Sequence, residues 1–268
     1  MPAFSLSPLS PFSPFSPIRS FSRNHALITA TLLVALTPGA FSAQAACVAS
    51  SGPTITPVIE LYTSEGCSSC PPADRWASSL KGTGALVQAF HVGYWDYIGW
   101  IDRFAAPAHT SRQREVALRN NLRGIYTPQA VLNGKDWPRW GGRLADTQEP
   151  ARVSIVLKQL ATDQFEASVT SVPGLQAPPS WSAYWTITEH GHAYRVQAGE
   201  NAGELLKHDF VVRQYTQAGE YKARETVAQK LTFRSIAATP GHERQVNLVV
   251  VDPKTGQTLQ AVSLQCAA

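Results

Sequence analysis

Two cysteines three residues apart, placed between a strand-like segment and a helix-like one, constrain this chain most. Residues 58–63 form a short apolar run typical of a buried strand. A turn containing glycine follows and leads to Cys67 and Cys70. Beyond the cysteines, apolar residues recur at the spacing of one helix face: Ala73, Trp76, Ala77 and Leu80. The segment therefore predicts a strand, a Cys-x-x-Cys motif and a helix.

A cysteine at the start of a helix is chemically activated. The unpaired N–H groups of the first turn and the positive end of the helix dipole both favour the thiolate. In Cys-x-x-Cys motifs this placement lowers the thiol pKa toward neutral pH. Pro71 and Pro72 are compatible with a first helical turn, where a missing N–H costs little. We therefore expect a thiol that is nucleophilic near neutral pH.

The first 45 residues have the pattern of a secretory signal peptide. Basic residues precede an apolar run at 26–36, and small residues follow it up to Ala45. The run is shorter than the roughly 20 residues that a membrane span needs. We expect cleavage near Ala45 and a periplasmic or secreted protein without a membrane span. Acylation of Cys47 as a lipoprotein is the alternative.

Export would change the expected chemical state of the cysteines, because in an oxidising compartment thiols form disulfides or cycle between thiol and disulfide. All four cysteines remain after cleavage. Cys47 and Cys266 lie at opposite ends of the mature chain, so we expect a structural disulfide that joins the termini. In the loop-entropy model such a closure stabilises by roughly 5 kcal/mol at most.

The charge of the chain argues against a nucleic-acid partner. Its formal net charge is +4, and no dense run of Lys and Arg follows the signal segment.

A second strand is expected at 85–92, and an aromatic loop follows it. Tyr94, Trp95, Tyr97 and Trp100 form either the wall of a peptide groove beside the thiols or part of the core under a long loop. The sequence leaves both readings open.

His91, at the end of this second strand, has three possible roles. It relays protons, ligates a metal or makes a structural hydrogen bond. Asp96 is placed similarly in the loop. A helix with a polar face is expected at 104–122.

A Thr127–Pro128 pair stands at the start of the next apolar strand, which ends in an Asn133–Gly134 hairpin turn. A cis peptide bond before Pro128 would supply a tight bend. It would also leave the Thr127 backbone free to pair with an incoming strand.

From about residue 153 onward the sequence pattern differs and predicts short strands separated by Gly, Pro and Asp/Asn turns. The expected strands are 153–160, 165–172, 183–189, 193–197, 209–215, 227–236, 245–251 and 259–264. This series suggests a small β-sandwich. The scattered His190, His192 and His208 are expected on the surface. The alternative is that residues 201–203 and His208 fold back over the cysteines.

The quoted segments carry a resemblance. The order strand, Cys-x-x-Cys, helix, strand, helix, Thr-Pro and strand is similar to a thioredoxin fold. Residues 61–74, 91–97, 126–129 and 201–203 resemble the exported bacterial proteins gathered as domain-of-unknown-function family 1223. Gly93 stands where that family more commonly has Asp.

The resemblance implies an α/β thioredoxin-like domain at 46–150, after the signal peptide at 1–45. A mainly β, sandwich-like domain follows at 151–268. It implies that Cys67 is the attacking thiolate, Cys70 the resolving thiol and Pro128 a cis-proline.

The same resemblance suggests further site residues. Glu60 would be a buried acid that accepts the proton of Cys70, unless it turns to solvent or to a structural hydrogen bond. Independently of the resemblance, the free Thr127 backbone and the aromatic loop with Tyr94 and Trp95 are expected to bind substrate.

Three function classes follow. The first is an enzyme, a thiol-disulfide oxidoreductase acting on a protein thiol or disulfide, with no cofactor beyond its redox-active disulfide and no metal. The second is a periplasmic copper chaperone that uses Cys67, Cys70 and His91 as ligands. The third is a non-catalytic binding module in which Cys67 and Cys70 form a structural disulfide.

Overall fold

The computed structural model describes residues 47–142, 144, 149–174, 179–223 and 227–266. The predicted signal peptide lies outside the described residues. Two α-helices and one short 3₁₀ helix are present in this part of the chain: α1 (Pro71–Ser79), α2 (Pro107–Arg119) and η1 (Asp96–Ile98). The strands are β1 (Val48–Ser50), β2 (Val58–Thr63), β3 (Leu86–His91), β4 (Gln129–Leu132), β5 (Lys135–Asp136), β6 (Val153–Ala161), β7 (Gln164–Ser171), β8 (Ser180–Glu189), β9 (His192–Arg195), β10 (Leu205–His208), β11 (Val211–Lys222), β12 (Gln229–Arg234), β13 (Arg244–Val251) and β14 (Thr258–Leu264).

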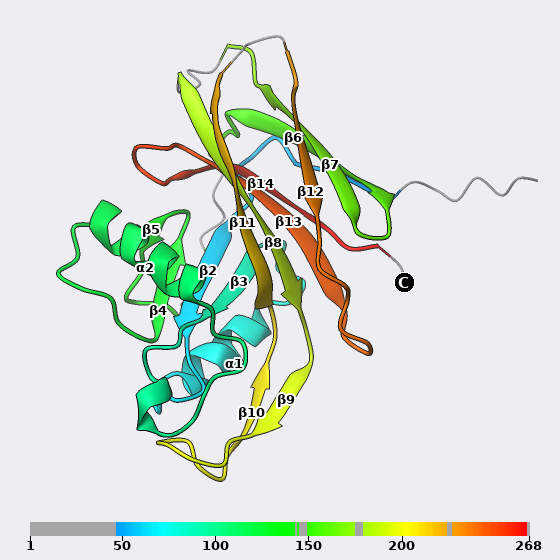
Figure 1. Cartoon of the computed structure of the whole chain (residues 1–268). Helices are drawn as coiled ribbons and strands as arrows, with labels where there is room; N and C mark the ends of the chain where they lie inside the picture. The colour runs from blue at the N-terminus through cyan, green and yellow to red at the C-terminus, as the bar shows by residue number, and fades with distance from the viewer. Residues whose placement is uncertain (1–46, 143, 145–148, 175–178, 224–226, 267–268) are drawn as a thin grey trace, which may run out of the picture. The chain divides into compact units, whose positions relative to one another are not determined.

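One mixed sheet of eight strands runs through both halves of the sequence (Figure 1). Its order is β14-β13-β8-β11-β3-β2-β4-β5. Strand β2 pairs in parallel with β3, and β3 pairs in parallel with β11 through a single bridge between Ala89 and Val211. The other neighbours in this sheet pair antiparallel. A sheet of four strands has the order β1-β6-β7-β12, and β9 and β10 form a separate hairpin.

The predicted fold class is wrong. The described residues are mainly β, with only two α-helices, and an α/β thioredoxin-like fold is not found. The local strand–helix–strand unit of β2, α1 and β3 does form. Its sheet, however, continues from β3 into β11, β8, β13 and β14 instead of ending as a small α/β unit.

The main apolar core lies between the two large sheets. Alternate residues of β6 and β7 are buried, as expected for strands with one covered face. Ile155, Phe165 and Leu231 of the four-stranded sheet pack in one cluster with Trp185 and Leu248 of the eight-stranded sheet. The Trp185 and Phe233 rings stack at 4.9 Å between centroids within this cluster.

Strand β2 is covered on both faces, and its side chains alternate between them. Ile59 and Leu61 pack against α1 through Ala73 and Ala77. Tyr62 packs on the other face in a cluster that includes Val116 of α2. The two helices therefore lie on opposite faces of the same strand. Neither α-helix of the described chain combines the length and the apolar character that crossing a membrane requires.

Candidate functional site

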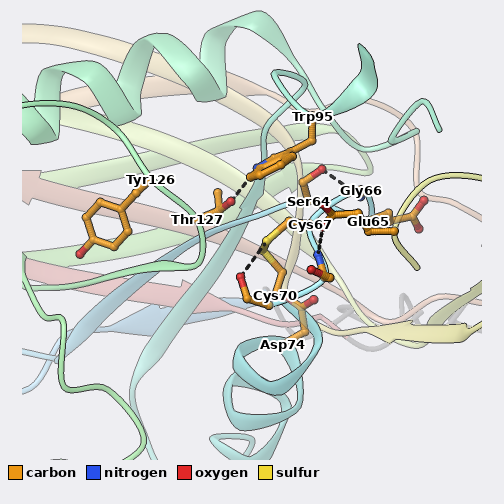
Figure 2. The surroundings of a disulfide bond; sticks show 12 residues. Ser64, Glu65, Gly66, Cys67, Cys70, Asp74, Trp95, Tyr126 and Thr127 are labelled. Carbon is orange, nitrogen blue, oxygen red and sulfur yellow. Dashed lines mark hydrogen bonds between the residues drawn. A yellow bond between two sulfur atoms is a disulfide. The ribbon is translucent and has the colours of Figure 1, made fainter. Parts of the chain in front are cut away.

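The Cys-x-x-Cys motif lies where the chain leaves β2 and enters α1. Cys70 is the N-cap residue of α1, and a disulfide joins it to Cys67. Figure 2 shows this bond at the N-terminal end of the helix. Both residues are buried, with exposed fractions of 1% for Cys67 and 0% for Cys70. A reductant reaches the sulfurs only after neighbouring residues move.

The start of α1 offers fewer free N–H groups than a typical helix. Its first two residues are prolines, and the next two N–H groups donate to the Cys70 carbonyl oxygen at 2.9 and 3.1 Å. The Ser69 hydroxyl is 3.4 Å from the Cys67 sulfur. Stabilisation of a Cys67 thiolate therefore depends on this hydroxyl and on the helix dipole more than on unpaired backbone donors.

The aromatic loop and the Thr127–Pro128 loop meet beside the disulfide. The indole N–H of Trp95 donates to the Thr127 hydroxyl at 2.7 Å (Figure 2). A Cβ atom at Gly66 would lie 3.1 Å from the Trp95 Cβ, so the residue before Cys67 must be small. The peptide bond between Thr127 and Pro128 is cis. Two of the three predicted substrate-binding residues thus lie together near the cysteines.

Tyr94, the third of these residues, is half-buried and packs against the apolar cluster on the α2 side of the sheet. It contributes to that cluster, and its ring also lies next to that of Trp95, at 6.2 Å between centroids. Tyr97 and Ile101 are the large apolar residues of this loop that reach solvent, with exposed fractions of 81% and 74%.

Glu60 does not lie under the disulfide. It projects from the α2 face of β2, where Arg112 donates two hydrogen bonds to its carboxylate at 2.6 and 2.8 Å. The hydroxyls of Tyr62 and Tyr184 donate to the same carboxylate. Burial raises the pKa of Glu60, but Arg112 and the hydroxyl donors outweigh it and hold the pKa below its ordinary value. This carboxylate is structural, and the helix with Cys70 lies across the sheet.

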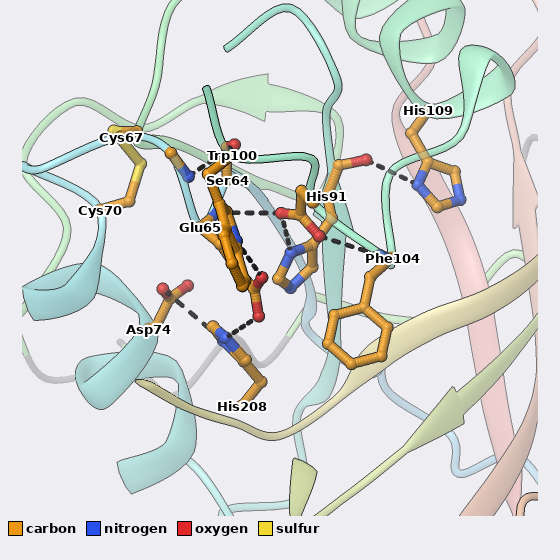
Figure 3. Close-up of polar contacts among 12 residues, drawn as sticks. Ser64, Glu65, Cys67, Cys70, Asp74, His91, Trp100, Phe104, His109 and His208 are labelled. Atoms are coloured by element: carbon orange, nitrogen blue, oxygen red, sulfur yellow. Dashed lines mark hydrogen bonds and ion pairs between the residues drawn. A yellow bond between two sulfur atoms is a disulfide. The ribbon is translucent and has the colours of Figure 1, made fainter. Parts of the chain in front are cut away.

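A different set of buried charges lies on the disulfide side (Figure 3). His208 of β10 donates from Nε2 to Glu65 Oε1 at 3.2 Å, and its Nδ1 is 3.9 Å from Asp74 Oδ2. Trp100 donates to the other oxygen of Glu65 at 2.7 Å. All three ionisable residues are at least nine-tenths buried. Burial raises the pKa of Asp74, and the charge of His208 opposes this.

His91 forms a second pair next to this set. Its Nδ1 is 2.7 Å from Asp102 Oδ2, which also accepts the Glu65 backbone N–H at 2.9 Å. The His91 and His208 rings meet edge to face at 4.9 Å between centroids. Burial lowers the pKa of His91, but the charge and hydrogen bond of Asp102 outweigh it, so the pKa is raised. His91 is thus a paired, buried group.

The tip of the β9–β10 hairpin covers the cysteine loop. Asn201 donates from Nδ2 to the Glu65 and Cys67 carbonyl oxygens at 2.8 and 3.1 Å. The Ser68 N–H donates to Glu200 Oε2 at 3.1 Å. Of the two alternatives for this segment, the structure shows the one in which it folds back over the cysteines.

Sequence reasoning missed part of this set. Glu65 and Asp74 lie inside the motif that carries the family resemblance, two residues before Cys67 and four after Cys70, and this spacing was the available signal. Asp102 had no such signal. The expectation of surface histidines is wrong, since His192 pairs with Glu189 at 3.1 Å and is 1% exposed. His190 and His208 are buried as well.

Within the described ranges, no group of three or more His, Cys, Asp and Glu side chains is arranged to hold a metal ion.

The second disulfide joins Cys47 to Cys266.

The site and fold define a mainly β protein in which a Cys-x-x-Cys disulfide lies beside buried carboxylates and histidines. The family model described as "Protein of unknown function (DUF1223)" matches residues 58–251, so the chain belongs to this family. No curated protein matches the sequence.

Two solved structures are similar in fold. Protein AGR_C_4864 from Agrobacterium tumefaciens is 20% identical, with a TM-score of 0.58 over 80% of this chain and 96% of that one. HBP35 of Porphyromonas gingivalis is 13% identical, with a TM-score of 0.51 over 80% of this chain and 76% of that one. These likenesses concern the fold alone.

Proposed function

We propose that the protein is a thiol-disulfide oxidoreductase that reacts through Cys67 and Cys70. The observation that carries this proposal is the disulfide between two cysteines three residues apart at the N-cap of α1. A bond that closes so short a loop restrains the unfolded chain little, about 2 kcal/mol in the loop-entropy model. Stabilisation of the fold alone is therefore a weak reason for the bond.

In the reductive half of the reaction, a substrate thiolate attacks the Cys67 sulfur. A bond forms between the substrate sulfur and Cys67, and the Cys67–Cys70 bond breaks. Its electron pair stays on Cys70, which takes up a proton. A second thiolate then releases Cys67 and leaves both cysteines reduced. Oxidation of a substrate dithiol by the Cys67–Cys70 disulfide is this sequence, and reduction of a substrate disulfide is its reverse.

In this proposal the hairpin tip at 196–204 limits access to the sulfurs, because it is hydrogen-bonded to the loop that carries Cys67. Asn201 and Glu200 hold it through three hydrogen bonds to backbone groups of the cysteine loop. Each such bond contributes about 1 kcal/mol net, so opening is energetically accessible. The tip thus controls how often the disulfide meets a partner.

The proposal includes a compartment and a partner. After cleavage near Ala45 the protein would act in the periplasm or outside the cell, where disulfides persist. Its partner would be a protein with a thiol or a disulfide, reached beside Trp95 and Thr127. No cofactor other than the disulfide is needed for this chemistry.

The test is reduction of insulin by dithiothreitol with and without the protein. Wild type should accelerate precipitation of the insulin B chain, and Cys67→Ser should reduce the rate to background. Cys70→Ser should accumulate a mixed disulfide on Cys67. Ser68→Ala keeps both thiols and should retain most of the activity. Acceleration that survives Cys67→Ser would refute the proposal.

One observation favours a second candidate, a binding module in which the disulfide is structural. Both sulfurs belong to buried residues. The reduction potential separates the two, because structural disulfides generally lie below about −300 mV and catalytic ones above.

A further inference from the structure

Asp74 lies one helical turn after Cys70 on α1. Residues four apart share a helix face, with Cβ atoms about 5–6 Å apart. Side chains on a helix point back toward its N-terminus, so the Asp74 carboxylate is directed toward Cys70. Figures 2 and 3 show it beside the disulfide end of the helix. A buried acid therefore lies on the same helix as the resolving sulfur, one turn away from it.

Three other elements enclose this carboxylate. His208 of β10 lies 3.9 Å away through Nδ1, an atom that has no hydrogen-bond partner. His208 is itself held by Glu65. His91 of β3 and Asp102 of the following loop act on Asp74 by charge. His208 and His91 favour the charged form of Asp74, whereas burial and Asp102 oppose it.

We propose that Asp74 exchanges a proton with the Cys70 sulfur during disulfide exchange, and that His208 and Glu65 are positioning residues for it. This rests on the proposed oxidoreductase function. When a thiolate attacks Cys67, the protonated Asp74 gives its proton to the leaving Cys70 sulfur and becomes a carboxylate. When Cys70 attacks a mixed disulfide on Cys67, the carboxylate takes the proton back.

The surroundings suit this role. A group that both gives and takes a proton works best when its pKa lies near the working pH. Burial moves the pKa of Asp74 in that direction. The geometry at His208 agrees with this role. Its unpartnered Nδ1 faces the Asp74 carboxylate, which in this proposal alternates between its neutral and charged forms. Glu65 fixes the ring by accepting from Nε2.

The experiment measures the rate at which dithiothreitol reduces the Cys67–Cys70 bond from pH 5 to 9. Acid quenching, alkylation and mass spectrometry of the peptide that carries both cysteines make the reading specific to this bond. Each rate is divided by the dithiothreitol thiolate concentration at that pH. In wild type the corrected rate should fall as pH rises through the pKa of Asp74. Asp74→Asn should give a flat profile, slower by about tenfold or more at the acidic end.

Three variants sharpen the result. Asp74→Glu should keep the fall with pH. His208→Gln removes a charge that lowers the pKa of Asp74, so it should move the midpoint of the fall to higher pH without abolishing it. Asp209→Asn, directly after the end of β10, is the matched control, since Asp209 pairs with Lys81 at 2.6 Å and should leave the profile unchanged.

A flat corrected profile in wild type would overturn the proposal without any variant, even if Asp74→Asn did not fold. A fall with pH that persists in folded Asp74→Asn would overturn it too. Dithiothreitol attacks the bond whether or not the protein has a redox partner. A protein inactive toward insulin would therefore refute the oxidoreductase function while still reporting on Asp74.

Discussion

The two disulfides of the described chain are chemically identical bonds in contrasting surroundings. Cys47–Cys266 spans 219 residues and packs beside the apolar core between the two sheets. Cys67–Cys70 spans three residues and lies beside buried carboxylates and histidines. The loop-entropy model assigns about 5 kcal/mol to the first closure and about 2 kcal/mol to the second. The first bond is therefore expected to contribute more to the stability of the fold. The second is surrounded by buried groups that are able to exchange protons.

The largest expected effect is the difference between the two bonds in their contribution to the free energy of unfolding. Replacing both Cys47 and Cys266 with Ser should lower the free energy of unfolding by about 5 kcal/mol at most. Replacing both Cys67 and Cys70 should lower it by about 2 kcal/mol. Urea unfolding with linear extrapolation measures both. A larger loss from the second pair would reverse the comparison.

The next effect concerns the buried charges on the α2 face of the sheet, which lie on the opposite side from Cys67–Cys70 and are expected to act on stability alone. Arg112→Leu should lower the free energy of unfolding by about 3–5 kcal/mol, because it leaves the Glu60 carboxylate buried without its cation. The exposed Arg114→Leu on the same helix should change it by less than about 0.5 kcal/mol. The corrected rate of Cys67–Cys70 reduction should not change in either folded variant. A slower rate in Arg112→Leu would connect Glu60 to the disulfide after all.

A smaller effect tests the cover over the second bond. Asn201→Ala removes two hydrogen bonds between the hairpin and the cysteine loop. Their combined loss, about 1–3 kcal/mol, should raise the rate of reduction by dithiothreitol about tenfold. Lys207→Ala, which changes an exposed side chain of the same hairpin, is the control. Equal rates in wild type and Asn201→Ala would mean that access is governed elsewhere.

The smallest effect is the opposite pH response of two buried acids. Glu60 has a lowered folded pKa, so its contribution to stability is present above the unfolded value of 4.5 and is lost as pH falls through the folded pKa. Asp74 has a raised folded pKa, so it favours folding below the unfolded value of 3.8 and loses this as pH rises through the folded pKa. Relative to wild type, Asp74→Asn should therefore gain stability as pH rises. Urea unfolding at pH 3 to 8 checks the sign, and a relative loss with rising pH would contradict it.

Local elements were predictable because they depend on patterns within a few residues. Each of the eight strands predicted after residue 150 overlaps an observed strand, and the helix predicted at 104–122 overlaps α2. Only β10 of the C-terminal strands was missed. The fold class was wrong because an alternating pattern shows that a strand has one buried face, but not which sheet it joins. The bridge from Ala89 to Val211, which merges the two halves into one sheet, leaves no local signal.

The residues of the candidate site likewise fall into those that a local motif predicts and those that only long-range packing brings to the site. The motif identified Cys67 and Cys70, and the quoted 126–129 segment identified Thr127. The alternation of β2 decided against Glu60, since a one-residue step along a strand moves a side chain to the opposite face. His208, Asn201 and Asp102 reached the site only because β10, the hairpin tip and the loop after η1 pack against the cysteine loop.

The sequence by itself determined that two cysteines stand at the start of a helix after a buried strand, and that the chain belongs to its family. Those features are encoded by spacing within short segments. The tertiary structure alone decided that strands from both halves of the chain join one mixed sheet of eight strands. It also decided that Asp74 faces His208 and that a hairpin some 130 residues away along the chain is hydrogen-bonded to the loop that carries Cys67. Such contacts arise from long-range strand pairing and packing, whose partners no local periodicity specifies.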